Sequence, residues 1–129
     1  MNLQFEASEH YQKALKQGRK SHRESVHQGQ YPYLRALDDF LEDGLVAGQV
    51  DLGVIEIPMD MIVGTKTAGR TNSFSSDFMP LLNEHSEFGW KWRKLCEAHL
   101  GEEGIRDPIR CYEYLGRFYV QEGNKRVSV

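Results

Sequence analysis

The 129-residue sequence lacks several features that define special classes of protein. It has no run of about eighteen apolar residues, so we expect no membrane-spanning helix and no membrane partner. Its first residues lack a basic segment followed by an apolar stretch, so we expect no signal peptide and a cytoplasmic location. What remains is an ordinary globular composition, 40% hydrophobic and 27% charged, which is enough for a single core.

Cysteine is scarce, and its placement indicates neither a metal site nor a redox motif. Cys96 and Cys111 have no metal-binding spacing and no Cys-x-x-Cys relationship. Because thiols stay reduced in the cytosol, we expect no disulfide between them, and we expect both to be ordinary reduced residues of the core. The spacing of the sequence identifies no metal ligands.

The net charge is −3, which argues against a protein that coats nucleic acid non-specifically. The charge is unevenly distributed, however. Residues 31–63 carry one basic side chain and seven acidic ones, whereas residues 64–79 and 108–129 together carry six basic and three acidic ones. If the fold brings the two basic segments together, they form one anion site.

Residues 1–48 are expected to form an arm of two helices. Ser8 can cap the first helix, and Gly29 breaks it. Helical spacing of apolar residues over 33–41 predicts the second helix. The first helix has an apolar stripe made of Tyr11, Leu15 and Val26. Its other face is basic and is interpreted as solvated, with Lys13, Lys16, Arg19, Lys20 and Arg23.

Residues 49–129 are expected to form the main domain, with a strand over 49–58 and a short helix from Ser76 or Asp77 to Leu82. A longer helix begins after Ser86, and a hairpin over 108–121 turns at Leu115-Gly116. This order of elements predicts the α+β class. The longer helix has an apolar face made of Phe88, Trp92, Leu95, Cys96 and His99, in which His99 is interpreted as structural.

The hairpin leads into a Gly-x-x-Arg turn, Gly123-Asn124-Lys125-Arg126, directly after Glu122. Glycine can take a positive φ and lets the backbone approach a ligand closely. If a helix begins here, its free N–H groups favour an anion, and Lys125 and Arg126 add positive charge. An ordinary surface turn is the alternative. Residues 126–129 are typical of a first helical turn, so we expect a domain cut from a longer protein.

Three separated motifs resemble those of ParB-like domains. Ile55-Glu56-Ile57-Pro58-Met59-Asp60-Met61-Ile62, with a loop ending in Arg70, is similar to the family's opening motif. Gly104-Ile105-Arg106-Asp107-Pro108-Ile109 resembles its second motif, and residues 116–126 resemble its G-x-[Y/F]-x-[I/V]-x-[D/E]-G-x-x-R motif. The resemblance covers about residues 50–129 and leaves the N-terminal helices unexplained.

The resemblance implies the ParB/sulfiredoxin fold, a small mixed-sheet domain whose nucleotide-binding members hold phosphates at the G-x-x-R turn. By that resemblance Gly123, Asn124, Lys125 and Arg126 would hold the phosphates of a nucleoside triphosphate, CTP or ATP, and Arg70 would reach the same pocket. Sulfiredoxins carry a nucleophilic cysteine where this chain has Asn124, so we expect no sulfinic-acid reductase activity. DNA binding would need regions outside this chain.

Three functions follow from these observations. The first is a nucleotide- or phosphate-binding domain with a regulatory or DNA-associated role, in which Glu122 holds a ribose, a metal or a hydroxyl. The second is a phosphotransfer or nucleotide-hydrolysing enzyme, with Glu122 as general base and Mg²⁺ shared with the phosphates. The third is a protein-interaction module that kept the fold but lost the ligand.

Overall fold

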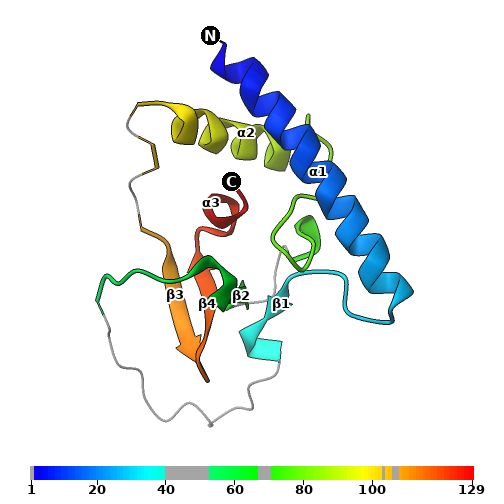
Figure 1. Ribbon diagram of the computed structural model, residues 1–129, viewed down its shortest axis with the longest axis vertical. Helices are drawn as coiled ribbons and strands as arrows, with labels where there is room; N and C mark the ends of the chain where they lie inside the picture. The colour runs from blue at the N-terminus through cyan, green and yellow to red at the C-terminus, as the bar shows by residue number, and fades with distance from the viewer. Residues whose placement is uncertain (1, 40–52, 67–70, 103, 106–107) are drawn as a thin grey trace.

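The computed structural model of the protein describes residues 2–39, 53–66, 71–102, 104–105 and 108–129. Within these ranges the chain forms three α-helices, three short 3-10 turns and a four-stranded mixed sheet (Figure 1). The predicted α+β class is therefore confirmed. None of the helices in the described part of the chain has the length and apolarity needed to cross a bilayer.

Helix α1 spans Leu3–His27 and begins earlier than the sequence suggested. Asn2 caps it, because its side-chain oxygen accepts hydrogen bonds from the backbone N–H groups of the next turn at 3.0 and 3.2 Å. Ser8 lies inside the helix, so its predicted capping role is wrong. Tyr11 is fully buried, as predicted, while Val26 is 57% exposed and lies outside the apolar stripe.

The second helix predicted over 33–41 is wrong for the residues that the structure describes. Strand β1, Arg35–Ala36, lies there instead, followed by a 3-10 turn at Leu37–Asp39. Burial alternates along this segment, since Leu34 and Ala36 are buried and Arg35 is exposed. Pairing with β2 favours this two-residue period over the helical spacing. Residues 40–41 lie outside the described ranges.

The strand predicted over 49–58 is also wrong where it can be seen, because residues 53–58 form no strand. Val54 is 89% exposed and Ile55 is 48% exposed, so no neighbouring strand covers these two β-branched side chains, although Ile57 packs against the main core. The strand follows later, as β2, Ile62–Thr65, which pairs in parallel with β1 and β4. Gly64 permits this packing, because a Cβ there would lie 2.4 Å from the carbonyl oxygen of Arg35.

The predicted hairpin is confirmed. Strand β3, Arg110–Tyr114, and strand β4, Arg117–Glu122, pair antiparallel around a turn at Leu115-Gly116, and the sheet order is β1-β2-β4-β3. The main core lies against this sheet. Its buried members are Leu34, Ile62, Phe74, Phe78, Phe118 and Val120.

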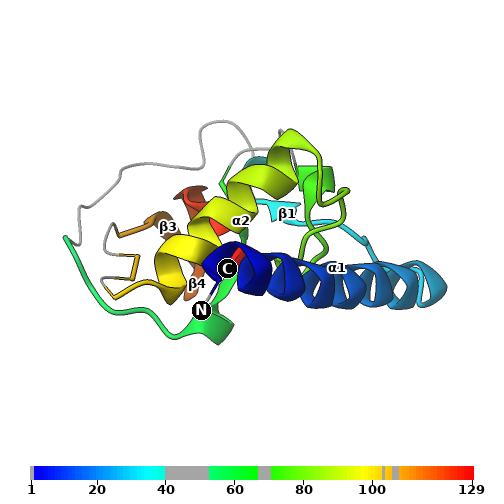
Figure 2. The same cartoon turned by 90° about the horizontal axis from the view of Figure 1, so that it is seen from above.

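Helix α2, Glu87–Leu100, begins at Ser86 as predicted, since the Ser86 hydroxyl accepts from the Gly89 N–H at 3.1 Å. It crosses α1, and their contact forms a second core (Figure 2). His99 is exposed, so its assignment to the apolar face is wrong. The residues buried between the two helices are Ala7, Tyr11, Leu15, Trp92 and Cys96.

Both cysteines occupy interior positions, as predicted. Cys96 is 4% exposed in the second core, and Cys111 is half-buried on β3 against the main core. Burial raises the pKa of each thiol above its ordinary value. Thiols of this kind are poor nucleophiles at neutral pH.

The segment between the two cores was expected to hold a short helix over 76–82, and that expectation is wrong. The chain turns there instead, with Phe78 at a positive φ of 66° and its ring buried in the main core. Two contacts join the segment to α1. The Tyr11 hydroxyl donates to the Leu82 carbonyl at 2.6 Å, and the Glu84 carboxylate accepts from Ser8 and Gln12.

Helix α3, Asn124–Ser128, follows β4 after a single residue, Gly123, and lies between the sheet and α2 (Figure 1). A buried hydrogen bond of 2.8 Å from the Trp92 indole Nε1 to the Ser128 hydroxyl joins it to α2. The Gly-x-x-Arg turn is thus held between the last strand and α2.

Candidate functional site

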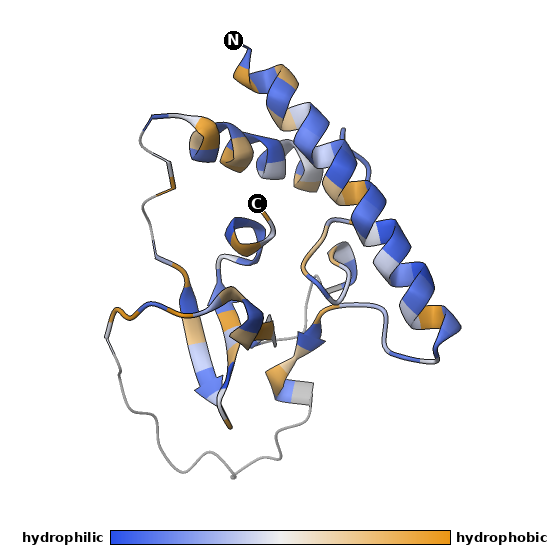
Figure 3. Cartoon of the chain, in the orientation of Figure 1, coloured by the Kyte–Doolittle hydropathy of each residue, from blue (hydrophilic) through white to orange (hydrophobic). Residues whose placement is uncertain are grey.

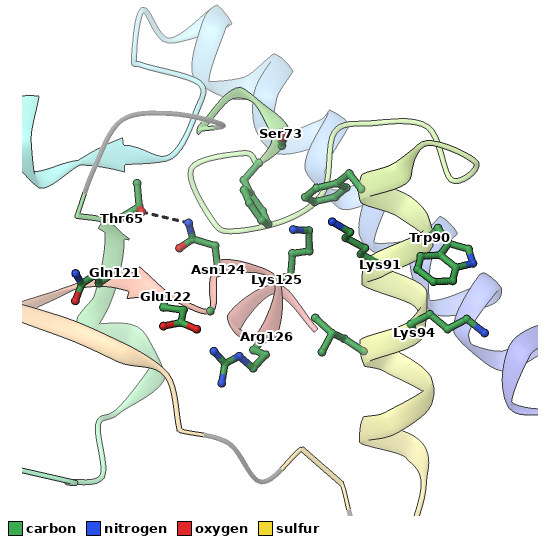
Figure 4. A pocket seen from close by; sticks show the side chains of 14 residues that line it. Thr65, Ser73, Trp90, Lys91, Lys94, Gln121, Glu122, Asn124, Lys125 and Arg126 are labelled. Atoms are coloured by element: carbon green, nitrogen blue, oxygen red, sulfur yellow. Dashed lines mark hydrogen bonds between the residues drawn. The ribbon is translucent and has the colours of Figure 1, made fainter.

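A cavity of about 610 Å³ opens where the β4–α3 turn faces α2 (Figure 4). Its residues come from four parts of the chain, namely the end of β2, the end of the 3-10 turn at Thr71–Ser73 with the residue that follows it, helix α2, and the end of β4 with the turn into α3. They are Thr65, Ser73, Phe74, Phe88, Trp90, Lys91, Lys94, Leu95, Gln121, Glu122, Gly123, Asn124, Lys125 and Arg126. Five of the six residues that the sequence assigned to the site therefore line this cavity.

Gly123 has the geometry that the sequence argument required. Its φ of 115° and ψ of 24° place it in the left-handed region, where residues with a Cβ are strained. A Cβ there would also lie 2.7 Å from the Ile109 side chain and 3.2 Å from the Arg126 guanidinium. The position thus requires glycine both for its backbone angles and for the space around it.

Asn124 joins the turn to the sheet. Its side-chain Nδ2 donates to the Thr65 hydroxyl at 3.2 Å, and that hydroxyl donates to the Val120 carbonyl at 2.9 Å. The Asn124 Oδ1 atom is buried and has no hydrogen-bond partner among the described residues. An unsatisfied buried acceptor is unusual and accepts a donor from a bound molecule or water at little cost.

Lys125 and Lys91 reach the cavity from opposite walls. The Lys125 ammonium lies over the Phe88 ring, 5.4 Å from its centroid, and in Figure 4 the Lys91 side chain extends from α2 toward the same space. Lys91 also forms an exposed ion pair of 2.8 Å with Glu87, one turn earlier on α2. Exposed pairs of this kind contribute little, so a ligand anion can compete for the ammonium.

Arg126 and Glu122 lie together at one end of the cavity (Figure 4). The Arg126 Nη1 donates to the Pro108 carbonyl at 3.0 Å, and the guanidinium lies beside the Gly123 backbone. Arg126 therefore fastens the start of β3 to α3 as well as lining the cavity. Glu122 is exposed and is the only carboxylate among the lining residues.

The two basic segments of the sequence meet only in part. They touch at Thr65 and Asn124, but Lys66 turns away to pair with Asp38 and lies 5.3 Å from the Tyr112 ring centroid. Arg70 lies outside the residues that the structure describes, so its predicted place in the site is not seen.

Sequence reasoning missed the contribution of α2. Lys91 lies three residues after Phe88 and four before Leu95, so all three side chains share one face of the helix. Lys94 lines the outer rim, where its ammonium lies 5.6 Å from the Trp90 ring centroid and 3.4 Å from Glu97. The sequence analysis assigned the whole apolar face of α2 to the core. The position of Lys91 between Phe88 and Leu95 on that face was the signal that could have indicated a binding site.

The site as a whole combines four cations, one carboxylate and an aromatic wall. Among the described residues, no group of three or more His, Cys, Asp or Glu side chains is arranged to hold a metal ion. Comparison of the chain with protein-family models, with curated proteins and with solved structures gives no match. The function is therefore inferred from the geometry of the cavity.

Proposed function

We propose that this cavity binds a phosphate-bearing small molecule, with a nucleoside triphosphate, CTP or ATP, as the ligand class that fits it best. The supporting observation is the convergence of cations from two elements on one cavity, Lys91 on α2 with Lys125 and Arg126 on α3. Charge-assisted hydrogen bonds from such groups are the usual means of holding phosphate. The ParB/sulfiredoxin resemblance, which assigns phosphates to the same turn, supports the same proposal.

The chemistry of the remaining lining fits the rest of a nucleotide. A volume of about 610 Å³ lies within the usual range of small-molecule sites. Phe74 and Phe88 meet edge to face, with ring centroids 5.1 Å apart, and supply an apolar wall. Aromatic rings stack on nucleobases without strong preference for one base. The Asn124 Oδ1 acceptor offers a partner to an N–H or O–H donor of the ligand.

The position of the Glu122 carboxylate supports a second candidate function, phosphotransfer or nucleotide hydrolysis. It lines the same cavity as Arg126 and is exposed, so it can accept a proton from a substrate hydroxyl. Mg²⁺ bound by phosphates needs only one or two protein carboxylates, and Glu122 would be one of them. Release of inorganic phosphate from ATP and CTP, compared between wild type and Glu122→Gln, separates this candidate from simple binding.

The direct test of binding is a thermal-shift series with ATP, CTP, GTP, inorganic triphosphate and the unphosphorylated nucleosides, each with and without Mg²⁺. A ligand that binds only the native state at a hundredfold excess over Kd raises the unfolding free energy by about 2.7 kcal/mol. We expect at least one triphosphate to raise Tm and its nucleoside to have no effect. If none of these compounds changes Tm, the proposal fails and the interaction-module alternative replaces it.

A further inference from the structure

Helix α1 carries a second cationic surface, which has no part in the cavity. Residues 10–23 contain five Lys and Arg side chains and no Asp or Glu. At 3.6 residues per turn these five lie within an arc of about 120°, over about 15 Å of helix. All are exposed. This surface, called the α1 stripe below, consists of Lys13, Lys16, Arg19, Lys20 and Arg23.

The α1 stripe is not neutralised by the rest of the protein that the structure describes. The ion pairs found there involve Lys66, Lys91 and Lys94, and none involves α1. Two carboxylates do approach the helix, but both bind amides, since Asp77 accepts from Gln17 and Glu84 accepts from Gln12. Two acidic side chains of α1 itself, Glu9 and Glu24, lie one turn before Lys13 and one turn after Lys20, at the two ends of the stripe, and neither forms an ion pair among the described residues. The stripe as a whole therefore keeps a net positive charge that can attract a polyanion.

The opposite face of α1 is buried, which fixes the orientation of the stripe. Tyr11 and Leu15 pack against α2, with the Tyr11 and Trp92 rings edge to face at 5.1 Å. Gly18 lies against the Pro80 backbone. The helix therefore presents its hydrophilic side outward along one edge of the molecule (Figures 2 and 3). The packing of α1 thus fixes which side of the helix, and so which five cations, faces solvent.

We infer that the α1 stripe binds the phosphate backbone of a nucleic acid. A duplex presents phosphates as a dense array, with one charge per about 1.7 Å of axis, so a row of cations about one helical turn apart can contact several phosphates at once. An acidic membrane fits less well. Interfacial helices insert an apolar face, and the apolar face of α1 is already buried in the second core.

The net charge of −3 does not oppose this inference, because the acidic residues are concentrated elsewhere. Seven of the nineteen acidic residues lie in residues 31–63, with one basic residue beside them. Charges separated by more than about 8–10 Å are largely screened at physiological salt, so the local field of the stripe governs contact with a polyanion. The inference is thus an alternative to the interpretation of this face as merely solvated.

The test is binding of a labelled 30-base-pair DNA duplex to the whole chain, measured by fluorescence anisotropy between 50 and 200 mM salt. Single-stranded DNA, duplex RNA and vesicles containing phosphatidylserine are run in parallel. Neutralising five phosphates predicts a slope of log K against log salt of about −4.5, or an affinity loss of about 500-fold over that range. Scrambled duplex sequences should bind equally, since phosphate contacts carry no sequence information.

The decisive variant is Lys16→Gln with Lys20→Gln, because glutamine keeps the helix propensity of lysine. It should reduce the slope to about −2.7 and the salt-induced loss to about 40-fold. The matched control is Arg110→Gln with Arg117→Gln, which removes two exposed charges from the hairpin, outside the cavity. The control should bind the duplex as wild type does. Circular dichroism checks that both variants remain folded.

Three outcomes would overturn the inference. Absence of nucleic-acid binding at 50 mM salt would show that the stripe is a solvated face. Equal losses in the two double variants would show a general charge effect with no role for α1. Binding to the vesicles without binding to any nucleic acid would replace the phosphodiester backbone by an anionic lipid surface. Binding to duplex but not to single strands, or the reverse, would support the inference and show which form of nucleic acid the stripe binds.

Discussion

Arg126 has two roles at the scale of single residues, and they are separable. Its guanidinium donates to the Pro108 carbonyl, which lies two residues before β3, and it fills the space beside Gly123 that a side chain would need. The sequence predicted the positive φ of Gly123, but it could not predict the Pro108 contact, because that contact depends on how the hairpin folds back. Removal of Arg126 is therefore expected to affect the fold as well as any bound ligand.

The variant Arg126→Ala should therefore reduce stability as well as binding. Loss of a charge-assisted hydrogen bond at a partly exposed site lowers the unfolding free energy by about 1 kcal/mol. Arg126→Lys should restore part of this loss, but little of the affinity for a triphosphate, because an ammonium cannot make two parallel hydrogen bonds to phosphate. Urea denaturation of the ligand-free proteins measures the first effect. If Arg126→Ala unfolds at the wild-type urea concentration, the Pro108 contact has no stabilising role.

Leu115 offers an opposite test, a substitution that should stabilise. Leu115 has a positive φ of 51°, and the φ of the following Gly116 is 79°. Two successive positive φ angles in a hairpin turn favour the sequence Asn-Gly, and the Leu115 side chain is 85% exposed. Leu115→Asn should raise the unfolding free energy by about 0.5–1 kcal/mol, since asparagine tolerates the left-handed region. Leu115→Ala, which keeps the backbone strain, should give no gain. A fall in Tm for Leu115→Asn would show that the Leu115 side chain has a packing role.

At the scale of elements, the two long helices were predicted because each has an apolar stripe at helical spacing, although the cap of α1 was misplaced. Ser86 and the stripe through Trp92 and Cys96 predicted α2 correctly. The segments around β1 and β2 were assigned wrongly because each is two to four residues long, and their pairing with distant residues determines their conformation. A conformation that is set by pairing with distant residues gives no periodic pattern in the local sequence.

The attachment of α1 to the 81–86 segment should depend on pH. Hydrogen bonds from Gln12 and then from Ser8 hold the pKa of Glu84 below its ordinary value of 4.5, despite partial burial that opposes them. A carboxyl with a lowered pKa stabilises the fold fully above its unfolded-state pKa, and that stabilisation is lost as the pH falls through the folded-state value. Glu84→Gln should therefore show a smaller fall of Tm than wild type as the pH decreases from 5 to 3.

Glu9→Gln is the matched control for that experiment. It removes an exposed carboxylate from α1, and the Glu9 side chain makes no hydrogen bond or ion pair among the described residues. Its Tm should follow the wild-type pH dependence. If Glu84→Gln and wild type lose stability equally in acid, the carboxylate does not fasten α1 to the domain.

At the scale of the whole molecule, the structure joins parts that the sequence treated separately. The residues of the predicted N-terminal arm supply β1 to the sheet and α1 to the second core, so α2 is held between α1 and α3. The candidate site arises from that arrangement. The turn at Gly123–Arg126 was found from its own residues, whereas Lys91 and the aromatic wall come into view only once α2 is placed against α3.

The most direct test of the central proposal is calorimetric titration of CTP and ATP, with Mg²⁺, into three proteins. These are wild type, the cavity variant Lys91→Gln with Lys125→Gln, and the α1 variant Lys16→Gln with Lys20→Gln, which removes the same charge outside the cavity. We predict saturable binding to wild type, an affinity at least about tenfold weaker in the cavity variant, and an unchanged affinity in the α1 variant. No binding to wild type, or equal losses in the two variants, would contradict the account.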